Sequence, residues 1–227
     1  MLETLEIIFI RDGAWLTILK GLWATVQISA LSLLFGTLLG AIICSLRLSN
    51  FKPAELCAKI YVEIIRGSPV LMLLMLLFYG VFARTDFSPL TIAVITFSLH
   101  TAAYVAELLR STFRTIDKGQ VEAARTLGFS KWQAFRLIAL PQIIFIAKPV
   151  YQSITINLIQ WTSVVGYVSI TDLTRVINNT AARTMQPMIT IIGGIILYLA
   201  LSNLVNVIFS WSNKKDLNGE AKTDERH

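Results

Sequence analysis

Polar side chains recur at helical spacing inside two long apolar stretches of this sequence. The first stripe consists of His100, Tyr104, Glu107 and Ser111. The second consists of Ser153, Asn157, Gln160 and Trp161, with Gln152, Thr155 and Thr162 beside it. Amides and hydroxyls in this arrangement suit a small zwitterion, because they bind ammonium and carboxylate without an excess of fixed charge. Trp161 offers an apolar or cation–π wall. We therefore expect a binding and translocation pathway for a polar solute.

Structural roles are open for several of these residues. Glu107 sits close to an interface and can pair with Arg110 or Arg66. Interhelical hydrogen bonds are the alternative for His100, Asn157 and Gln160. Both readings remain open from the sequence.

Catalysis is not expected. His100 is the only histidine in an apolar stretch, the other being the terminal His227, and Cys44 and Cys57 lack the spacing of metal ligands. A nucleophile–base pair or a metal cluster would be needed for an enzyme. The chain also lacks the Gly-x-x-x-x-Gly-Lys-Ser/Thr loop that cradles nucleotide phosphates. We expect no catalytic residue, no metal site and no cofactor in this chain.

A polar segment of about thirty residues separates the two stripes. Val121, Ala124 and Leu127 fall at helical spacing, and Gly128 permits the left-handed conformation that ends a helix. Ser130 is suited to cap a second short helix, which we expect Pro141 to stop. The pattern predicts two short helices, joined at the glycine, that form a compact helix pair at the membrane surface.

The surrounding elements are predicted to be membrane-spanning helices. The chain of 227 residues is 55% hydrophobic and 15% charged, with a mean hydropathy of +0.64. Soluble domains carry roughly a quarter charged residues, and a helix needs about 20 apolar residues to cross a bilayer. Gly67-Ser68-Pro69 predicts a kink or break in the second span. The five predicted spans are 21–46, 58–82, 89–109, 143–170 and 187–211.

The basic residues set the predicted orientation. With the N-terminus outside, only five of the 20 Lys and Arg residues fall in outer segments and the other fifteen fall inside, as the positive-inside rule requires. Those five are Arg11, Lys20, Arg84, Arg175 and Arg183. Topology therefore also explains the net charge of +6, and no nucleic-acid partner is expected.

The predicted fold is an all-α membrane protein with five transmembrane helices, the N-terminus outside and the C-terminus cytoplasmic. A short cytoplasmic helix pair lies between spans three and four. The expected segments are an extracytoplasmic 1–20, a transmembrane domain 21–212 with a cytoplasmic loop at about 114–142, and a cytoplasmic tail 213–227.

The polar loop resembles the signature of permease subunits of binding-protein-dependent ABC importers. That signature is Glu-Ala-Ala, three residues, Gly, nine residues, then Ile-x-Leu-Pro. This chain matches it at Glu122, Ala123, Ala124, Gly128, Ile138, Leu140 and Pro141. The resemblance implies that the loop is a coupling helix, which seats in a groove of a separate ATPase.

Further segments resemble the polar amino-acid, or histidine/glutamine-type, permeases. They are Arg66-Gly67-Ser68-Pro69, Ala103 to Glu107 followed by Arg110, Asp117 to Gln120, and Asp172-Leu173-Thr174-Arg175. The resemblance implies an importer of polar amino acids that works by ATP-driven alternating access in the bacterial cytoplasmic membrane, as a multi-pass protein. It also implies several partners: an ATPase dimer that binds ATP and Mg, a second permease subunit, an extracytoplasmic substrate-binding protein, and membrane lipid.

Two positions depart from the subfamily pattern. Gln160-Trp161 stands where the subfamily usually has Lys followed by an acid, and His100 stands where it usually has Asn. One hypothesis is that this chain is one half of a heterodimer whose other half keeps the charged pair; a homodimer is the alternative.

Two alternative functions remain. A different importer subfamily is the first, because the loop signature is shared across substrates. An ion-coupled secondary transporter is the second, since broken helices and polar groups inside the membrane suit it; the long cytoplasmic loop and the absence of an internal repeat argue against it.

Overall fold

The regular structure is helical throughout the described part of the chain. The computed structural model describes the backbone of residues 13–224 and the side chains of residues 13–211, so Arg11, His227 and most of the predicted segments 1–20 and 213–227 lie outside the described side chains. The elements are α2 (Ala14–Arg47), α3 (Lys52–Gly67), α4 (Val70–Met75), π-helix η2 (Leu76–Val81), α5 (Pro89–Thr115), α6 (Lys118–Thr126), α7 (Lys131–Ala134), π-helix η3 (Phe135–Ala139), α8 (Leu140–Trp161), 3₁₀-helix η4 (Thr162–Val168), α9 (Leu173–Thr184) and α10 (Pro187–Asp224).

Four described helices are long and apolar enough to cross a membrane, and a fifth span is present if one bent helix pair counts as one. The four are Ala14–Arg47, Pro89–Thr115, Lys131–Val168 and Pro187–Trp211. The predicted starts at Pro89 and Pro187 are confirmed, whereas the first span begins at Ala14, earlier than the predicted residue 21.

The break predicted in the second span is confirmed and is severe. α3 and the α4–η2 segment meet at 109° across Ser68 and Pro69. Pro69 lacks an amide hydrogen and precedes α4 in an extended conformation, so the helix cannot run through it. The Ser68 hydroxyl donates to the carbonyl of Ile64 at 2.7 Å and satisfies one of the carbonyls that the break leaves over.

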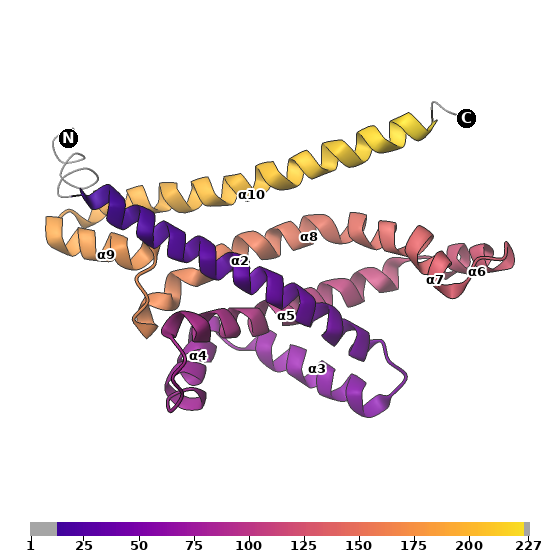
Figure 1. Cartoon of the computed structure of the whole chain (residues 1–227), viewed down its shortest axis with the longest axis horizontal. Helices are drawn as coiled ribbons and strands as arrows, with labels where there is room; N and C mark the ends of the chain where they lie inside the picture. The colour runs from indigo at the N-terminus through magenta and orange to yellow at the C-terminus, as the bar shows by residue number, and fades with distance from the viewer. Residues whose placement is uncertain (1–12, 225–227) are drawn as a thin grey trace. The chain divides into compact units, whose positions relative to one another are not determined.

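Two compact units divide the chain, residues 28–154 and residues 1–27 with 155–227. In the first unit, α3 packs on α5, and the core includes Ala58 and Val62 of α3 with Ala102, Ala103 and Ala106 of α5 (Figure 1). Small residues permit this close approach, as is common between membrane helices.

Glycines bring α2 onto α5 in the same unit. A Cβ atom on Gly36 would lie 2.7 Å from Cβ of Thr101, and one on Gly40 would lie 2.8 Å from Cβ of Val105. These distances are far below van der Waals contact, so the two positions require glycine.

The second unit is organised around Asp172, which is fully buried. Its carboxylate accepts hydrogen bonds from the backbone amides of Thr174 and Arg175, both at 3.0 Å, and thereby caps α9. Burial raises the pKa of the Asp172 carboxyl above its ordinary value, and the hydrogen bonds from those backbone amides oppose the rise. Thr25 accepts from the backbone amide of Leu173 at 3.3 Å, which ties α2 to this cap.

The prediction that Pro141 stops the second loop helix is wrong. The chain stays helical from Lys131 through η3 into α8, and one candidate span covers Lys131–Val168. Pro141 lies inside this continuous helix, directly after the π-helix η3. The π-helix η3 directly before it changes the backbone hydrogen-bond pattern there.

Candidate functional site

The first half of the polar loop is the helix α6, which ends at Gly128. The backbone amide of Gly128 donates to the carbonyl of Arg125 at 3.1 Å, and that of Phe129 donates to the carbonyl of Ala124 at 3.2 Å. Gly128 has a φ of +93°. This bond pair and the left-handed glycine make a Schellman motif. The predicted glycine stop is therefore confirmed.

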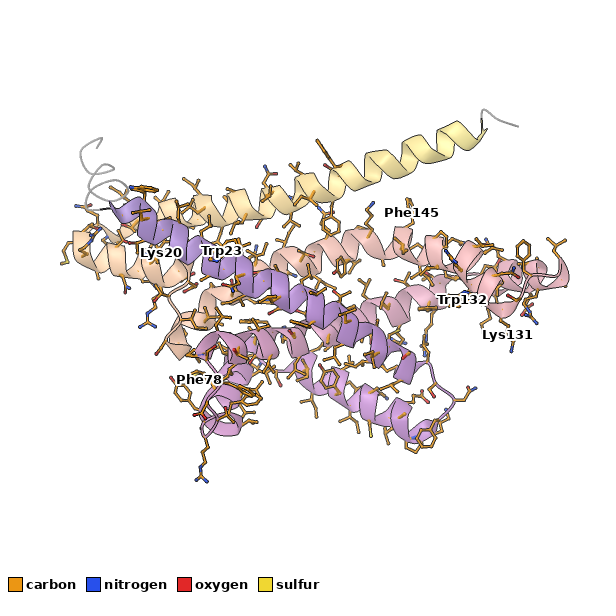
Figure 2. All side chains as sticks on the ribbon, viewed as in Figure 1. Lys20, Trp23, Phe78, Lys131, Trp132 and Phe145 are labelled. Carbon is orange, nitrogen blue, oxygen red and sulfur yellow. The ribbon has the colours of Figure 1, made fainter. Side chains whose placement is uncertain are left out.

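The second half begins with a capping box. Gln133 donates its backbone amide to the Ser130 hydroxyl at 3.2 Å, and the Ser130 amide donates to Oε1 of Gln133 at 2.8 Å. The predicted role of Ser130 as helix cap is confirmed. The position of α7 at one end of its unit can be seen from the labelled Lys131 and Trp132 (Figure 2).

Aromatic rings connect this second half to α5. Phe113 at the end of α5 and Phe135 in η3 stack with an interplanar angle of 2° and ring centroids 6.0 Å apart. Trp132 contacts Phe135 with centroids 5.7 Å apart. The loop is therefore packed against the helix that precedes it.

A glutamine pair connects α6 to α8. Nε2 of Gln142 donates to Oε1 of Gln120 at 2.7 Å and to the carbonyl of Ile138 at 2.9 Å. The second bond satisfies a backbone carbonyl close to Pro141. One side chain thus joins the first loop helix to the start of the following span.

The signature residues divide into exposed and buried ones. Glu122, Ala123, Gly128 and Pro141 are exposed, Ala124 is buried, and Ile138 and Leu140 are half-buried. Next to them, Leu127 is 80% exposed and Trp132 is 65% exposed. Large apolar side chains grouped at an exposed surface are typical of protein contact sites. The loop can therefore offer a docking surface.

The stripe on α5 lies partly inside the helix bundle. His100 is 3% exposed, and its ring centroid lies 5.1 Å from that of Tyr104. The Arg66 guanidinium lies over the Tyr104 ring, 5.3 Å from the centroid. A cation in this position is attracted to the ring face. The sequence offered Arg66 as one of two possible partners of Glu107. In the structure Arg66 contacts Tyr104 instead.

Glu107 takes two arginine partners. Its carboxylate accepts from Nη1 of Arg47 and from Nη2 of Arg110, and Nε of Arg110 lies 3.2 Å from Oε2. The proposed pairing with Arg110 is present. Arg47 was predicted only as a topological charge, and no local pattern connects it to a residue sixty positions away.

α8 contacts α5 within residues 28–154. Ala147 and Ile154 of α8 pack with Leu108 of α5, and Tyr104 and Tyr151 pack against this cluster. Tyr151 also shares a 2.7 Å hydrogen bond with Thr37 of α2. α5 and this part of α8 are therefore in contact.

The remaining pathway candidates follow on α8 and η4. Gln152 and Trp161 are half-buried, whereas Asn157 and Gln160 are exposed. Thr162 is fully buried and donates to the carbonyl of Ile159 at 2.7 Å. The unit of residues 1–27 and 155–227 contains Asn157, Gln160, Trp161 and Thr162. The unit of residues 28–154 contains His100, Tyr104, Glu107 and Gln152.

One element was missed by the sequence interpretation. α9 carries Leu173, Val176, Ile177 and Thr180 on its buried face, at the spacing of a helix. With Asp172 as a capping residue directly before it, the pattern could have been recognised. Arg175 of this helix donates Nη1 to the carbonyl of Gly166 at 3.1 Å.

Comparison with known proteins gives a consistent result. Residues 6–215 match the family described as "Binding-protein-dependent transport system inner membrane component". The chain is 35% identical over 199 residues to the "Probable amino-acid ABC transporter permease protein YckA" of Bacillus subtilis, covering 87% of this chain and 88% of the relative. It is 33% identical over 198 residues to the glutamate/aspartate import permease protein GltK of Escherichia coli, covering 82% and 88%.

Solved structures agree in fold. A crystal structure of an amino acid ABC transporter with histidines superposes with a TM-score of 0.79 at 28% identity, over 88% of this chain and 94% of that one. An inward-facing MetNI methionine ABC transporter superposes with a TM-score of 0.75 at 20% identity, over 91% and 99%. The second likeness concerns the fold alone.

Proposed function

The chain belongs to the family of binding-protein-dependent transport system inner membrane components, and from this premise we propose that it is the permease subunit of an ABC importer for polar amino acids. Its location is the bacterial cytoplasmic membrane, with the N-terminus outside and the C-terminus inside. The observation that carries the proposal is the loop from Glu122 to Pro141, which combines the family signature with a rigid, exposed apolar surface.

The loop acts as the coupling element. Its exposed Glu122, Ala123, Leu127 and Trp132 dock on a cytoplasmic ATPase dimer, which binds the ATP and Mg. Phe113 stacked on Phe135 and Gln120 bonded to Gln142 make the loop stiff. Motion of the ATPase therefore reaches α5 and α8 as a rigid-body displacement, and the pathway alternates between outward and inward access.

A second permease subunit covers part of α8. Ser153, Asn157 and Gln160 lie on one stripe of this helix and are all exposed. Polar side chains in a membrane span face the bundle interior or a water-filled cavity, because lipid cannot satisfy their hydrogen bonds. A partner subunit, identical or not, would enclose these residues together with the half-buried Gln152 and Trp161 in a pathway. A purified complex with two copies of this chain would rule out the heterodimer.

The relatives support amino acids as the cargo. They include a glutamate/aspartate import permease and an L-cystine transport system permease. An external binding protein delivers the substrate to the outer face, and the polar residues of α5 and α8 offer hydrogen bonds to its ammonium and carboxylate groups. We include His100, Tyr104 and Glu107 among the groups that line or shape this route.

The test is a substrate panel on the reconstituted complex. This chain, its ATPase and its binding protein are placed in lipid vesicles. ATP hydrolysis is measured with each of the twenty amino acids, with L-cystine, and with a sugar and a metal chelate for comparison. We expect stimulation by one or a few polar amino acids and none by apolar ones. Stimulation by a sugar or a metal chelate, with none by amino acids, would assign the chain to another importer subfamily.

A further inference from the structure

A polar cavity of about 670 Å³ lies between α3 and the second half of α5, next to the end of α2. The residues of α3 in its wall follow one helical face, as do those of α5. Its lining is Arg47, Glu55, Lys59, Val62, Glu63, Arg66, Gly67, Tyr104, Glu107, Arg110 and Arg114. Five of these side chains are cationic and three are anionic, so the cavity has an excess of positive charge.

The carboxylates in the wall are already paired. Glu107 is held by two arginines, as described above. Glu63 lies 3.8 Å from Lys59, and Glu55 lies 3.1 Å from Lys52. All the negative charge of the wall is therefore engaged.

Two arginines of the wall keep their charge uncompensated. Among the described side chains, neither Arg66 nor Arg114 forms an ion pair with a carboxylate. Arg66 is held over the Tyr104 ring, which orients its guanidinium without neutralising it. A planar guanidinium binds phosphate oxygens in pairs, and it does so more strongly than a lysine ammonium. The cavity is thus equipped for an anion that carries phosphate oxygens.

An exposed apolar stripe on α3 favours a lipid over a free anion as the ligand of this cavity. Leu56, Ile60 and Ile64 recur every four residues on α3, directly beside the charged face, and all are exposed. A ligand with a phosphate in the cavity and acyl chains along this apolar stripe would use both faces of the helix. Inorganic phosphate would use only one.

We propose that this cavity binds the phosphate headgroup of an anionic phospholipid from the cytoplasmic leaflet, with Arg66 and Arg114 as its main contacts. Basic pockets between membrane helices on the cytoplasmic side are suited to such headgroups. The inference rests on the proposed function and its topology, in which the connection between α2 and α3 faces the cytoplasm. It does not depend on the ATPase.

Lipid retention by the purified full-length chain tests the proposal. Native mass spectrometry compares phosphatidylglycerol with phosphatidylcholine of identical acyl chains. We expect preferential retention of phosphatidylglycerol, and about fivefold weaker retention in each of Arg66→Gln and Arg114→Gln, the factor that corresponds to about 1 kcal/mol per basic residue near an anionic surface. Arg125→Gln on α6 removes one exposed arginine outside the cavity and serves as the matched control, with retention unchanged.

Three results would overturn it. Equal retention of the two lipids would show that the headgroup charge is not recognised. Equal losses in all three variants would assign the effect to general surface charge. Displacement of phosphatidylglycerol by millimolar inorganic phosphate or by soluble glycerophosphate would show that the cavity binds a free anion and not a lipid. None of these results would affect the assignment as a permease, which the amino-acid panel tests separately.

Discussion

Arginines from two helices hold the carboxylate of Glu107. Arg47 comes from the end of α2 and Arg110 from the next turn of α5, and the Glu107 side chain is 23% exposed. The pair of Glu63 and Lys59 on α3 has similar chemistry, yet the Glu63 side chain is 62% exposed. Water screens an exposed pair far more strongly than a shielded one. We infer that Glu107 helps to hold α2 against α5.

Replacing each glutamate by glutamine should separate these two cases. Glu107→Gln leaves two shielded guanidinium groups without a counter-charge, and we expect it to lower the free energy of unfolding by about 1–3 kcal/mol. Glu63→Gln should lower it by less than about 1 kcal/mol. Thermal unfolding followed by tryptophan fluorescence in detergent measures both. Equal shifts for the two variants would contradict the structural role of Glu107.

Sequence reasoning finds residue pairs only when they are local. The spacing of Glu107 and Arg110 is that of neighbours on a helix, so this pair could be predicted. The contacts of Arg47 with Glu107 and of Thr37 with Tyr151 join residues far apart in the chain. They depend on how helices pack, which one sequence without relatives does not determine.

At the scale of the element, the proposed coupling loop depends on one glycine. Gly128 has a φ of +93°, and a Cβ atom there would meet nothing within 4 Å. Substitution therefore acts through backbone strain alone, since there is no side chain to collide with. A left-handed conformation costs an ordinary residue about 1–2 kcal/mol, and asparagine adopts it more readily.

We expect Gly128→Val to abolish transport and substrate-stimulated ATP hydrolysis while the protein still inserts in the membrane. Valine is β-branched and disfavours the left-handed conformation, so α6 would lose its end and the docking surface its shape. Gly128→Asn is the control at the same position and should keep most of the activity. Uptake by Gly128→Val at the normal rate would speak against docking through this loop.

The hydrogen-bonded pair of Gln120 and Gln142, here called the glutamine clamp, gives a second prediction for this element. Gln142→Ala removes both the bond to Gln120 and the bond to the Ile138 carbonyl, whereas Gln120→Ala removes only the first. If the clamp transmits motion, transport per ATP hydrolysed should fall in both variants and fall further in Gln142→Ala. The ratio of uptake to hydrolysis in proteoliposomes measures this. An unchanged ratio in both variants would remove the clamp from the coupling route.

The sequence anticipated some ends of elements and not others, for physical reasons. Pro69 follows Gly67-Ser68 and α3 ends before it, whereas the helix continues through Pro141, directly after the π-helix η3. The same residue type thus has opposite effects at two positions. The π-helix η3 carries no composition signal of its own, so the sequence alone does not distinguish these positions.

At the scale of the whole molecule, the orientation in the membrane is an independent prediction. Asn50 lies between α2 and α3, and Asp86 lies between η2 and α5. In a background with Cys44 and Cys57 replaced by alanine, a membrane-impermeant maleimide should label Asn50→Cys only in inverted vesicles and Asp86→Cys only in intact cells. The reverse pattern would invert the topology and place the proposed coupling loop on the side of the membrane away from the ATPase.

The helical architecture was predictable because hydropathy reports on it directly. Four candidate spans, and a fifth if the bent helix pair counts as one, follow from apolar runs of sufficient length. α9 was missed because it is too short and too polar to register as a span. The polar residues were recognised as one set, yet their burial ranges from the fully buried Thr162 to the exposed Gln160, because it depends on the packing of the folded bundle.

The most direct test of the account is amino-acid uptake into proteoliposomes that hold this chain, its binding protein and either an active or a hydrolysis-deficient ATPase. The stimulating amino acid from the panel is supplied outside and ATP inside. We predict uptake with the active ATPase and none above background with the deficient one, whatever ion gradient is imposed. Uptake that persists with the deficient ATPase and follows an ion gradient would contradict the account and favour a secondary transporter.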